Sequence, residues 1–331
     1  MDSKVLVTGS TGCIGSATVA YLLAQDVEKI IGFSRQASNA DVPAAWADRV
    51  SMVAGDIADE DSVRRSLDTV RPTHIIHLAA FQTPDCQAYP FRGMDINVGG
   101  TMFLCKAAAA LGDHVKRFVC ASSIAVHGPR DIYPGPTIRP QDPYFPPSLY
   151  GYWKVANEGF GQAYHMETGV PTVSVRLAST YGPGRDRGMT SAPTTAIKAA
   201  ALGLSYRIPY VGREHYHFVD DVGAGFAQCA MEPFAGGYGV FNLRGRTVET
   251  NDFVATLRSV AQDLDLADRF DIAVADDAIA IPFGCDFDEE DTVAAFPKMP
   301  LTDLKDGVRA SLELFIAQAR AGELTEEDVD V

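Results

Sequence analysis

The sequence predicts an α/β fold, in which a doubly wound parallel sheet carries a smaller lobe at its C-terminal end. Two features of the first half lead to this prediction. Short β-branched runs alternate with amphipathic helical stretches, and the first run is followed by glycines at three-residue spacing. Because strand–helix–strand units join as right-handed parallel crossovers, the alternation predicts a parallel sheet. The 331 residues suffice for one large α/β unit or two unequal lobes.

The first strand is expected over residues 4–8, where Val5, Leu6 and Val7 are apolar throughout, as in strands buried on both faces. The other expected strands cover residues 29–33, 50–53, 74–78, 117–120 and 172–176, and the expected helices cover residues 12–24, 59–67, 94–111 and 150–168. After residue 176 the pattern loosens. Segments rich in proline and glycine, at residues 128–147, 181–188 and 236–239, look like loops that frame a cleft.

These elements divide the chain into two expected parts. Residues 1–180 form the larger domain, and residues 181–331 form mainly the second lobe, with some strands and helices returning to the first domain. We find no internal repeat and no low-complexity tract. The tail at residues 321–331 is acidic, and we expect it to fray, as chain ends commonly do.

Charge and composition exclude several classes of protein. The formal net charge is −15 and the isoelectric point is near 4.8, so the surface repels DNA phosphates and anionic lipid headgroups. Nucleic acid and membranes are therefore not expected partners, and no apolar run approaches the length of a membrane span. There is no secretory-signal pattern, and the six scattered cysteines form no CxxC pair. We therefore expect a cytoplasmic protein with reduced thiols and no metal site.

The first strand runs into a glycine-rich turn of the kind that binds a dinucleotide. Gly9 permits a tight turn, Gly12 lets the backbone approach a pyrophosphate, and Gly15 lets the following helix pack closely on the strand. The N-terminus of that helix offers free N–H groups and its positive dipole end to phosphates. At the first strand–helix junction this pattern predicts a Rossmann fold, and the alternative is a merely structural glycine turn. The rest of the predicted cofactor loop consists of Thr11, Cys13 and Ile14.

The end of the second expected strand bears on the choice of cofactor. NAD sites usually place an acidic residue there, which hydrogen-bonds the ribose hydroxyls. Here Ser34 and Arg35 follow the apolar run instead. Arg35 can pair with a 2′-phosphate and Ser34 can donate to it, so NADP(H) is the preferred cofactor. NAD(H) stays possible if Arg35 is only a solvated surface arginine.

A tyrosine and a lysine four residues apart form the centre of the predicted catalytic set. On a helix, the side chains of Tyr150 and Lys154 share one face. An ammonium close to a phenol favours the tyrosinate form, which suits Tyr150 to exchange a proton with a carbinol or ketone. Lys154 can also hold the nicotinamide ribose, and Ser123 can hydrogen-bond the reacting oxygen. The alternative is a chance pair on a helix surface.

Further short motifs extend along nearly the whole chain in a fixed order. They are TGSTGCIG (8–15), Gly55-Asp56-Ile57, His77-Leu78-Ala79-Ala80, Asn97-Val98-Gly99-Gly100-Thr101, Ser122-Ser123 with Val126-His127-Gly128, Tyr150-Gly151 with Lys154 and Glu158, Arg176-Leu177 with Tyr181-Gly182-Pro183-Gly184, Val219-Asp220-Asp221-Val222 and Phe241-Asn242-Leu243. With these motifs the chain resembles the extended short-chain dehydrogenase/reductases, specifically the NAD-dependent epimerase/dehydratase family.

The resemblance implies a role for each matching position. Tyr150 would exchange the proton while hydride moves between the nicotinamide and a substrate carbon, and Asn97 would stabilise the site from the following helix. The residues implied to contact the cofactor, besides the glycine loop, Tyr150 and Lys154, are Asp56 and Ile57 at the adenine and Leu78, Ala79 and Ala80 along its length. Members of the family often form homodimers through paired helices, here at residues 97–111 and 150–168. The alternative is that both helices pack only within the monomer.

Departures from the family pattern bear on the substrate. Ile124 and Ala125 stand where dehydratases carry an acidic pair, so we set aside water elimination. Ser179 replaces a usual asparagine, and Glu214 stands where an arginine usually binds a diphosphate. A carboxylate facing a diphosphate would repel it. Both changes disfavour a nucleotide sugar and leave room for a small sugar, a sugar acid or another hydroxy-ketone.

Six residues are candidates for contact with the substrate: Gln82, His127, Ser179, Arg185, His215 and His217. His215 and His217 alternate, so they share a face of a strand, but we find no third ligand for a metal. Arg185 and Arg187 lie in a glycine-rich loop and can bind an anionic group, or both can be solvated. Cys13 is a small filler of the phosphate loop, or, if its thiol is exposed, a site of oxidation.

Three hypotheses follow. The first is an NAD(P)-dependent oxidoreductase that acts on a small sugar, sugar acid or related hydroxy-ketone. The second is a nucleotide-sugar 4-epimerase, for example of a UDP-sugar, which retains its cofactor and returns the hydride to the other face. The third is a non-catalytic NADP(H)-sensing protein. Arg35 and Glu214 favour the first hypothesis over the second, and the intact Ser123–Tyr150–Lys154 set argues against the third.

Overall fold

A computed structural model describes residues 3–25, 27–35, 38–39, 42, 46–266, 269–281 and 283–329 of the chain. Its centre is a seven-stranded sheet in the order β10-β6-β5-β4-β1-β2-β3, in which the neighbouring strands are parallel. The strands are β1 (Lys4–Thr8), β2 (Lys29–Ser34), β3 (Val50–Ala54), β4 (His74–His77), β5 (Arg117–Ser123), β6 (Thr172–Leu177) and β10 (Tyr238–Asn242). The predicted α/β fold with a doubly wound parallel sheet is confirmed.

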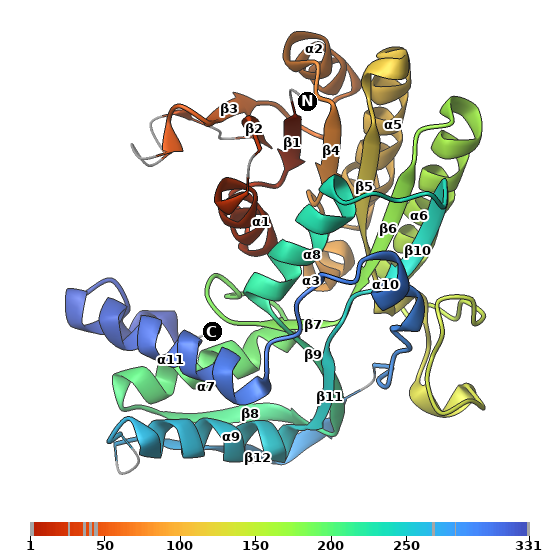
Figure 1. The fold of residues 1–331 in the computed structure, drawn as a ribbon. Helices are drawn as coiled ribbons and strands as arrows, with labels where there is room; N and C mark the ends of the chain where they lie inside the picture. Colours follow the sequence, from red (N-terminus) through yellow and green to blue (C-terminus); the bar gives the residue numbers. More distant parts are fainter. Residues whose placement is uncertain are drawn as a thin grey trace.

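Helices cover both faces of this sheet because its strands are apolar on both sides (Figure 1). Val5 and Val7 of β1 pack under α1 (Cys13–Ala24) and α8 (Val219–Met231), whereas Leu6 packs on the opposite face. That opposite face is covered by α2 (Glu60–Val70), α5 (Gly100–Ala110) and α6 (Leu149–Thr168). This alternation within one strand is what the period-2 geometry of β-structure requires. From β1 the chain adds β2 and β3 on one side of the sheet and then β4, β5 and β6 on the other. The strand order therefore reverses at β1, which creates a crevice at its carboxyl end.

The single helix expected over residues 94–111 is built differently. A short helix α4 (Pro90–Met94) leads into a π turn at Asp95–Gly99, which continues into α5. A separate helix α3 (Thr83–Ala88) precedes it. π turns inside helices often mark functional positions, and this one contains Asn97.

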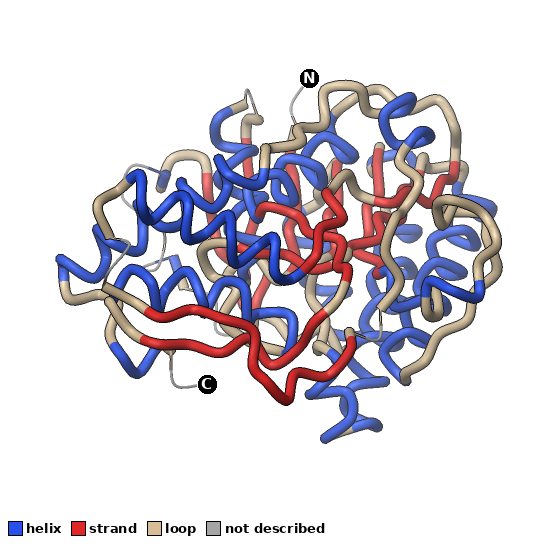
Figure 2. The backbone as a smooth tube through the Cα atoms, turned by 90° about the horizontal axis from the view of Figure 1, so that it is seen from below, coloured by secondary structure: helices blue, strands red, loops and turns tan. Residues whose placement is uncertain are grey.

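The residues after β6 build a second lobe and also return to the main sheet. The lobe contains a three-stranded sheet in the order β11-β9-β7 and a two-stranded sheet of β8 and β12. Its elements are β7 (Ser179–Tyr181), α7 (Ala192–Leu202), β8 (Ser205–Val211), β9 (Arg213–Phe218), β11 (Arg246–Glu249), α9 (Thr250–Asp263), β12 (Asp271–Ala280) and α11 (Leu304–Ala321). Viewed from below, long strands and helices of this lobe run side by side (Figure 2). A short helix α10 (Glu290–Ala295) precedes α11.

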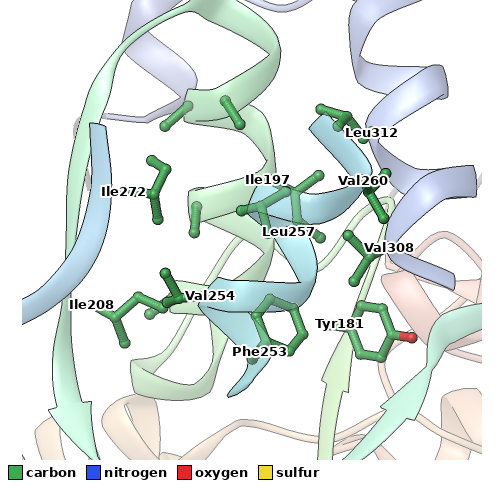
Figure 3. Packing of buried hydrophobic residues seen from close by; sticks show 14 of the residues in the cluster. Tyr181, Ile197, Ile208, Phe253, Val254, Leu257, Val260, Ile272, Val308 and Leu312 are labelled. Atoms are coloured by element: carbon green, nitrogen blue, oxygen red, sulfur yellow. The ribbon is translucent and has the colours of Figure 1, made fainter. Parts of the chain in front are cut away.

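The second lobe has its own apolar core (Figure 3). Ile197 of α7, Leu257 of α9 and Leu312 of α11 meet there over Ile208 of β8 and Ile272 of β12. Each of these five side chains is fully buried. The second lobe is therefore a packed body with its own core. Among the described residues, no helix combines the length and the apolar composition needed to span a membrane.

The acidic tail does not fray as expected within the residues that the structure describes. A 3₁₀ turn at Glu326–Asp328 is closed by a capping box, in which the Thr325 and Asp328 side chains satisfy backbone N–H groups reciprocally. Leu324 and Val329 are buried in the core of the second lobe. The prediction was wrong because the charges on this segment obscured two apolar residues that anchor it.

Candidate active site

The glycine turn between β1 and α1 has the geometry expected of a dinucleotide loop. Gly9 has φ +70°, and a Cβ there would lie 3.0 Å from the backbone nitrogen of Ala79. A Cβ on Gly15 would lie 2.1 Å from the carbonyl oxygen of Gly9, so the protein itself excludes side chains at both positions. At Gly12, however, a Cβ would meet only the Gly9 oxygen, at an ordinary 3.4 Å. The space beside Gly12 therefore fits close approach of a pyrophosphate.

A buried histidine connects the end of β1 to the end of β4. The Thr8 hydroxyl oxygen accepts hydrogen bonds from the N–H groups of Leu78 and Ala79, each over 3.1 Å. Its own proton is then free to be donated to Nδ1 of His77, 2.8 Å away. Burial and, after it, the Lys154 charge lower the pKa of His77 to about 3, so the ring is neutral. These bonds hold the predicted cofactor residues Leu78 and Ala79 against the glycine turn.

The chain of hydrogen bonds continues into the π turn. With Nδ1 of His77 accepting, Nε2 donates to the Thr101 hydroxyl over 3.1 Å, and that hydroxyl donates to the carbonyl of Asn97 over 2.9 Å. The Asn97 amide in turn clamps the backbone of Phe81, accepting from its N–H over 2.7 Å and donating to its carbonyl over 3.0 Å. Asn97 therefore shapes the loop after β4, next to Ala80.

The catalytic helix approaches the end of β5 through a glycine. The Ser148 side chain caps α6 by accepting from the N–H of Gly151 over 3.2 Å. A Cβ on Gly151 would lie 2.2 Å from the carbonyl oxygen of Ala125, in the turn that follows Ser123. Only glycine lets the first turn of α6, with the half-buried Tyr150, lie against this turn.

Lys154 is held beneath Tyr150. Its side chain is 3% exposed and its Nζ donates to the carbonyl of Ala121 in β5 over 2.7 Å. The same Nζ lies 5.4 Å from the centroid of the Tyr150 ring, as the four-residue spacing predicts. The ammonium is thus fixed between the strand that carries Ser123 and the tyrosine ring.

The two adjacent serines at the end of β5 point in opposite directions, as alternate residues of a strand do. The Ser122 hydroxyl donates to the carboxylate of Glu158. The Ser123 oxygen accepts from the N–H of Ala125 over 3.1 Å and makes only a long, 3.4 Å bond to the carbonyl of Leu177. Ser123 thus keeps a hydroxyl proton that is weakly engaged by protein, as a residue that bonds a substrate oxygen requires.

Arg176 and Glu158 form a buried ion pair beneath the end of β5, and the sequence motifs did not explain it. Arg176 and Glu158 are completely enclosed and make two parallel bonds of 2.8 Å. Arg176 also donates to Nε2 of His127 over 2.9 Å, and Tyr144 donates to Glu158 over 2.8 Å. The spacing of Lys154 and Glu158, one helical turn apart, is the signal that could have placed Glu158 under the catalytic strand.

His127 therefore belongs to a structural network. Because its Nε2 accepts from Arg176, its Nδ1 is left to donate to the Tyr133 hydroxyl, 3.2 Å away. Burial, and then the Arg176 charge, lower the pKa of His127 to about 4. With both nitrogens engaged by protein groups, the ring packs in the protein and has no free polar atom to offer a substrate.

His215 and His217 share one face of β9 as predicted, with ring centroids 5.1 Å apart. In His217, Nε2 accepts from the N–H of Ala178 over 2.9 Å and Nδ1 donates to the carbonyl of Arg244 over 2.8 Å. Nδ1 of His215 bonds Thr247 over 3.0 Å. Within the described residues no group of three or more potential ligands could hold a metal ion.

Ser179 and Glu214, the two departures noted above, contact each other. The Ser179 hydroxyl donates to one carboxylate oxygen of Glu214, and Tyr210 donates to the other over 2.9 Å. Glu214 is 2% exposed, and burial raises its pKa against the opposing effect of these donors and of the Arg185 charge. The sequence predicted that Glu214 is unlike the usual arginine, but not that it binds Ser179.

Arg185 and Gln82 are also brought together. Nη1 of Arg185 donates to Oε1 of Gln82 over 3.0 Å, and Nη2 donates to the Thr190 hydroxyl over 2.7 Å. Two of the six candidate substrate residues act on the carboxylate of Glu214, Ser179 through a hydrogen bond and Arg185 through its charge. The rings of His127 and His215 lie against Phe287, and His217 bonds the backbone next to Ser179.

The adenine end of the expected cofactor site holds an ion pair. Asp56 pairs with Arg92 over 2.7 Å, and Arg35 is exposed at the end of β2 beside Ser34. Burial of Asp56 is outweighed by the Ala58 N–H and by Arg92 and Arg35, so its pKa is lowered. Ile57 is buried and lies against α5. Arg92 was not among the predicted site residues.

Cys13 behaves as a filler. Its thiol lies 3.7 Å from the carbonyl oxygen of Pro183, and burial raises its pKa to about 11. A thiol with so high a pKa is seldom a thiolate at neutral pH, which disfavours the alternative of an oxidation-sensitive site. The contact also places the loop at residues 182–188 directly over the phosphate turn.

Comparison with known proteins defines the class. The parallel sheet and its glycine turn are those of a Rossmann-type enzyme, and the model of the NAD dependent epimerase/dehydratase family matches residues 5–243. The chain therefore belongs to the NAD dependent epimerase/dehydratase family, among the extended short-chain dehydrogenase/reductases, and is an enzyme.

The similar curated proteins are enzymes of nucleotide-sugar chemistry. A UDP-glucose 4-epimerase from Halalkalibacterium halodurans is 29% identical over 279 residues, which are 77% of this chain and 80% of that protein. A UDP-glucose 4-epimerase from Streptomyces lividans is 31% identical over 208 residues, 62% of this chain and 60% of that protein.

Solved structures share the fold over the full length. The UDP-glucose 4-epimerase of Thermus thermophilus in complex with NAD has a TM-score of 0.77 and 23% identity, covering 94% of this chain and 98% of that one. The L-threonine dehydrogenase of Clostridium difficile has a TM-score of 0.78 and 19% identity, covering 98% and 99%. At these identities the likeness establishes the fold and leaves the substrate open.

Proposed function

We propose that this enzyme is an NAD(P)-dependent oxidoreductase that moves hydride to or from a carbinol or ketone carbon of a small sugar, sugar acid or related hydroxy-ketone. The observation that carries the proposal is the buried pair of Ser179 and Glu214. The pair is buried and joined by a hydrogen bond, and by the family resemblance its two residues stand where nucleotide-sugar enzymes usually present asparagine and arginine to a diphosphate. A buried carboxylate there repels a diphosphate instead of binding it.

The chemistry follows from the side chains around Ser123. The Ser123 hydroxyl donates to the substrate oxygen, and Tyr150 gives or takes the proton of that oxygen. Lys154, fixed by the Ala121 carbonyl, holds its ammonium 5.4 Å from the centre of the Tyr150 ring and would bond a ribose hydroxyl of the cofactor. A bound nicotinamide would accept or supply the hydride. Asn97 and His77 keep the loop after β4 in place beside it.

For the cofactor we propose a preference for NADP(H), with NAD(H) as the alternative. Arg35 is exposed at the end of β2 and free to reach a 2′-phosphate, and its charge already acts on Asp56. The solved structure of the related epimerase from Thermus thermophilus contains NAD, which favours the alternative for this chain.

A nucleotide-sugar 4-epimerase is the second candidate, because the curated relatives described above are enzymes of that kind. The two candidates differ in how they treat the cofactor. An epimerase regenerates its cofactor in each cycle and retains it, whereas a dehydrogenase or reductase must exchange it. A non-catalytic sensor would bind the cofactor without needing Tyr150.

The first experiment analyses the purified protein for co-purified cofactor and titrates it with NADPH and NADH, following nicotinamide fluorescence. Exchangeable binding with tighter affinity for NADPH supports the oxidoreductase. Tightly retained NAD that does not exchange, together with interconversion of UDP-glucose and UDP-galactose, would replace that proposal with the epimerase.

We also propose the homodimer that the resemblance implies through the helices at residues 97–111 and 150–168, and we extend its surface to α4, which lies beside α6. Phe91 and Tyr152 are 80% and 60% exposed on these neighbouring helices, and Trp153 packs against Gly93 between them. Large exposed aromatic side chains are typical of an interface. Light scattering of the wild type and of Phe91→Glu tests this: a dimer that the variant converts to monomer supports it, and a monomeric wild type contradicts it.

A further inference from the structure

Arg185, in the loop at residues 182–188, contacts the segment that follows β4. Its Nη1 donates to Gln82 over 3.0 Å. Because β4 and β5 are parallel neighbours, the segment after β4 and Ser123, at the end of β5, lie at the same edge of the sheet. The guanidinium is therefore held at the edge of the sheet that carries Ser123.

The guanidinium has an unused donor. Nη1 and Nη2 bond Gln82 and Thr190, but Nε is buried and has no hydrogen-bond partner within the part of the chain that the structure describes. A buried N–H of a charged group that lacks a protein acceptor needs another acceptor, and a ligand oxygen can supply it. The Gln82 side chain, held through its oxygen, has its amide N–H groups left to donate to the same ligand.

The surrounding charges leave this loop positive. Asp186 is neutralised by Lys198 at 2.7 Å, and Arg187 is exposed. Glu214, the carboxylate whose pKa Arg185 influences, already accepts from Ser179 and Tyr210 and so needs no further donor. A locally positive loop on a protein of net charge −15 favours one small anion over a neutral ligand.

We infer that Arg185, assisted by Gln82, anchors the carboxylate of a hydroxy acid whose carbinol carbon faces Tyr150 and Ser123. This inference rests on the proposed oxidoreductase function and narrows its substrate class to sugar acids and related polyhydroxy acids. The hydride leaves the carbinol carbon for the oxidised nicotinamide, the hydroxyl proton goes to Tyr150, and the product is a keto acid. The carboxylate takes no part in this electron transfer, so its role is orientation.

The test compares acids with neutral analogues of the same length: glycerate, threonate and gluconate against glycerol, threitol and sorbitol. Wild type, Arg185→Gln, Arg185→Lys and the control Arg187→Gln are assayed for oxidation with NADP⁺ and NAD⁺. Binding of each compound to the enzyme–cofactor complex is measured by calorimetry, and the Kd of the cofactor alone by fluorescence. We expect an acid to bind, and Arg185→Gln to weaken it by roughly 30- to 100-fold.

The expected pattern is selective. Arg185→Lys should recover part of the affinity, Arg187→Gln should weaken binding of the acid far less than Arg185→Gln because its charge is exposed to solvent, and the Kd of the cofactor should stay within about twofold in each variant. Equal binding of acids and neutral analogues by the wild type would overturn the inference. So would an equally large loss of cofactor affinity in Arg185→Gln, because Arg185 would then serve the cofactor pyrophosphate.

The outcomes separate this inference from the function on which it rests. Oxidation of neutral polyols with no binding of acids would leave the oxidoreductase intact and remove the carboxylate anchor. Binding of an acid that Arg185→Gln abolishes, with no hydride transfer from any compound in the panel, would support the anchor and count against the oxidoreductase.

Discussion

The glycine turn with the Ser123–Tyr150–Lys154 set and the edge of the second lobe at Ser179 and Glu214 differ in how they are positioned. In the first region short motifs supply the functional side chains and their spacing, and Ser148 caps the helix by accepting from Gly151; the bond from Lys154 to Ala121 then joins that helix to β5. In the second region the sequence carries no such motif, and the contacts, such as Gln82 with Arg185, join residues far apart in the chain. The comparison teaches that local motifs identify the reaction machinery, whereas the contacts of the substrate candidates come only from long-range packing.

The largest effect is expected from a substitution that disables only the first region. Tyr150→Phe removes the proton-exchanging hydroxyl and should lower turnover by roughly 10³-fold, because acid–base catalysis is lost. Cofactor affinity, measured by fluorescence, should change little. Tyr152→Phe, on the exposed side of the same helix, is the matched control and should keep full activity. A Tyr150→Phe variant with wild-type turnover would make Tyr150 a bystander.

The second prediction tests whether the close approach of α6 to the turn after Ser123 positions Tyr150. Gly151→Ala places a Cβ against the Ala125 carbonyl and should push the start of α6 away from Ser123, lowering turnover by roughly 10²-fold. Gly159→Ala lies on the same helix with no atom near its Cβ, so it should stabilise the protein by about 0.5–1 kcal/mol. Kinetics and thermal unfolding of both variants give the comparison, and equal behaviour of the two would contradict it.

The third prediction contrasts one serine from each region. Ser179→Ala deprives the buried Glu214 of a donor and should lower the free energy of unfolding by about 2 kcal/mol, with unchanged cofactor affinity. Ser123→Ala should lower turnover but cost less than about 1 kcal/mol, since its hydroxyl is weakly bonded. Urea unfolding and steady-state rates measure both. If Ser179→Ala is as stable as the wild type, the hydrogen bonds to Glu214 do not stabilise this edge of the second lobe.

The fourth prediction uses a buried neutral histidine from each region, His77 and His217. The pKa of each is lowered to about 3 in the folded protein, chiefly by burial. The unfolded chain, with a pKa near 6.5, takes up these protons first, so stability is present above about pH 6.5 and is lost as the pH falls toward 3. At pH 5 each histidine should cost about 2 kcal/mol. His77→Gln and His217→Gln should each flatten this decline, and an unchanged slope would show that neither ring stays neutral.

The smallest expected effect concerns the cofactor. Arg35→Ala should weaken NADPH binding by roughly 10-fold and leave NADH binding unchanged, because only NADPH carries the 2′-phosphate. Arg92→Ala, which removes the partner of Asp56 instead, should affect both cofactors alike. Equal affinities for the two cofactors in the wild type would show that Arg35 is a solvated arginine.

The sequence by itself determined the parallel sheet, the glycine turn and the spacing of Tyr150 and Lys154. These features are encoded within windows of a few residues, where backbone conformation and side-chain periodicity follow directly from residue type. The same short-range information predicted that His215 and His217 share a face.

Only the tertiary structure decided what those side chains contact. His127 and His217 looked available for a substrate, yet Arg176 and the Ala178 backbone, from other segments of the chain, occupy their Nε2 atoms. The acidic sequence of the tail predicted fraying, whereas in the structure Leu324 and Val329 lie in the core of the second lobe. Hydrogen-bond saturation and burial depend on residues brought together by folding, and the linear pattern carries no record of which donors will meet which acceptors.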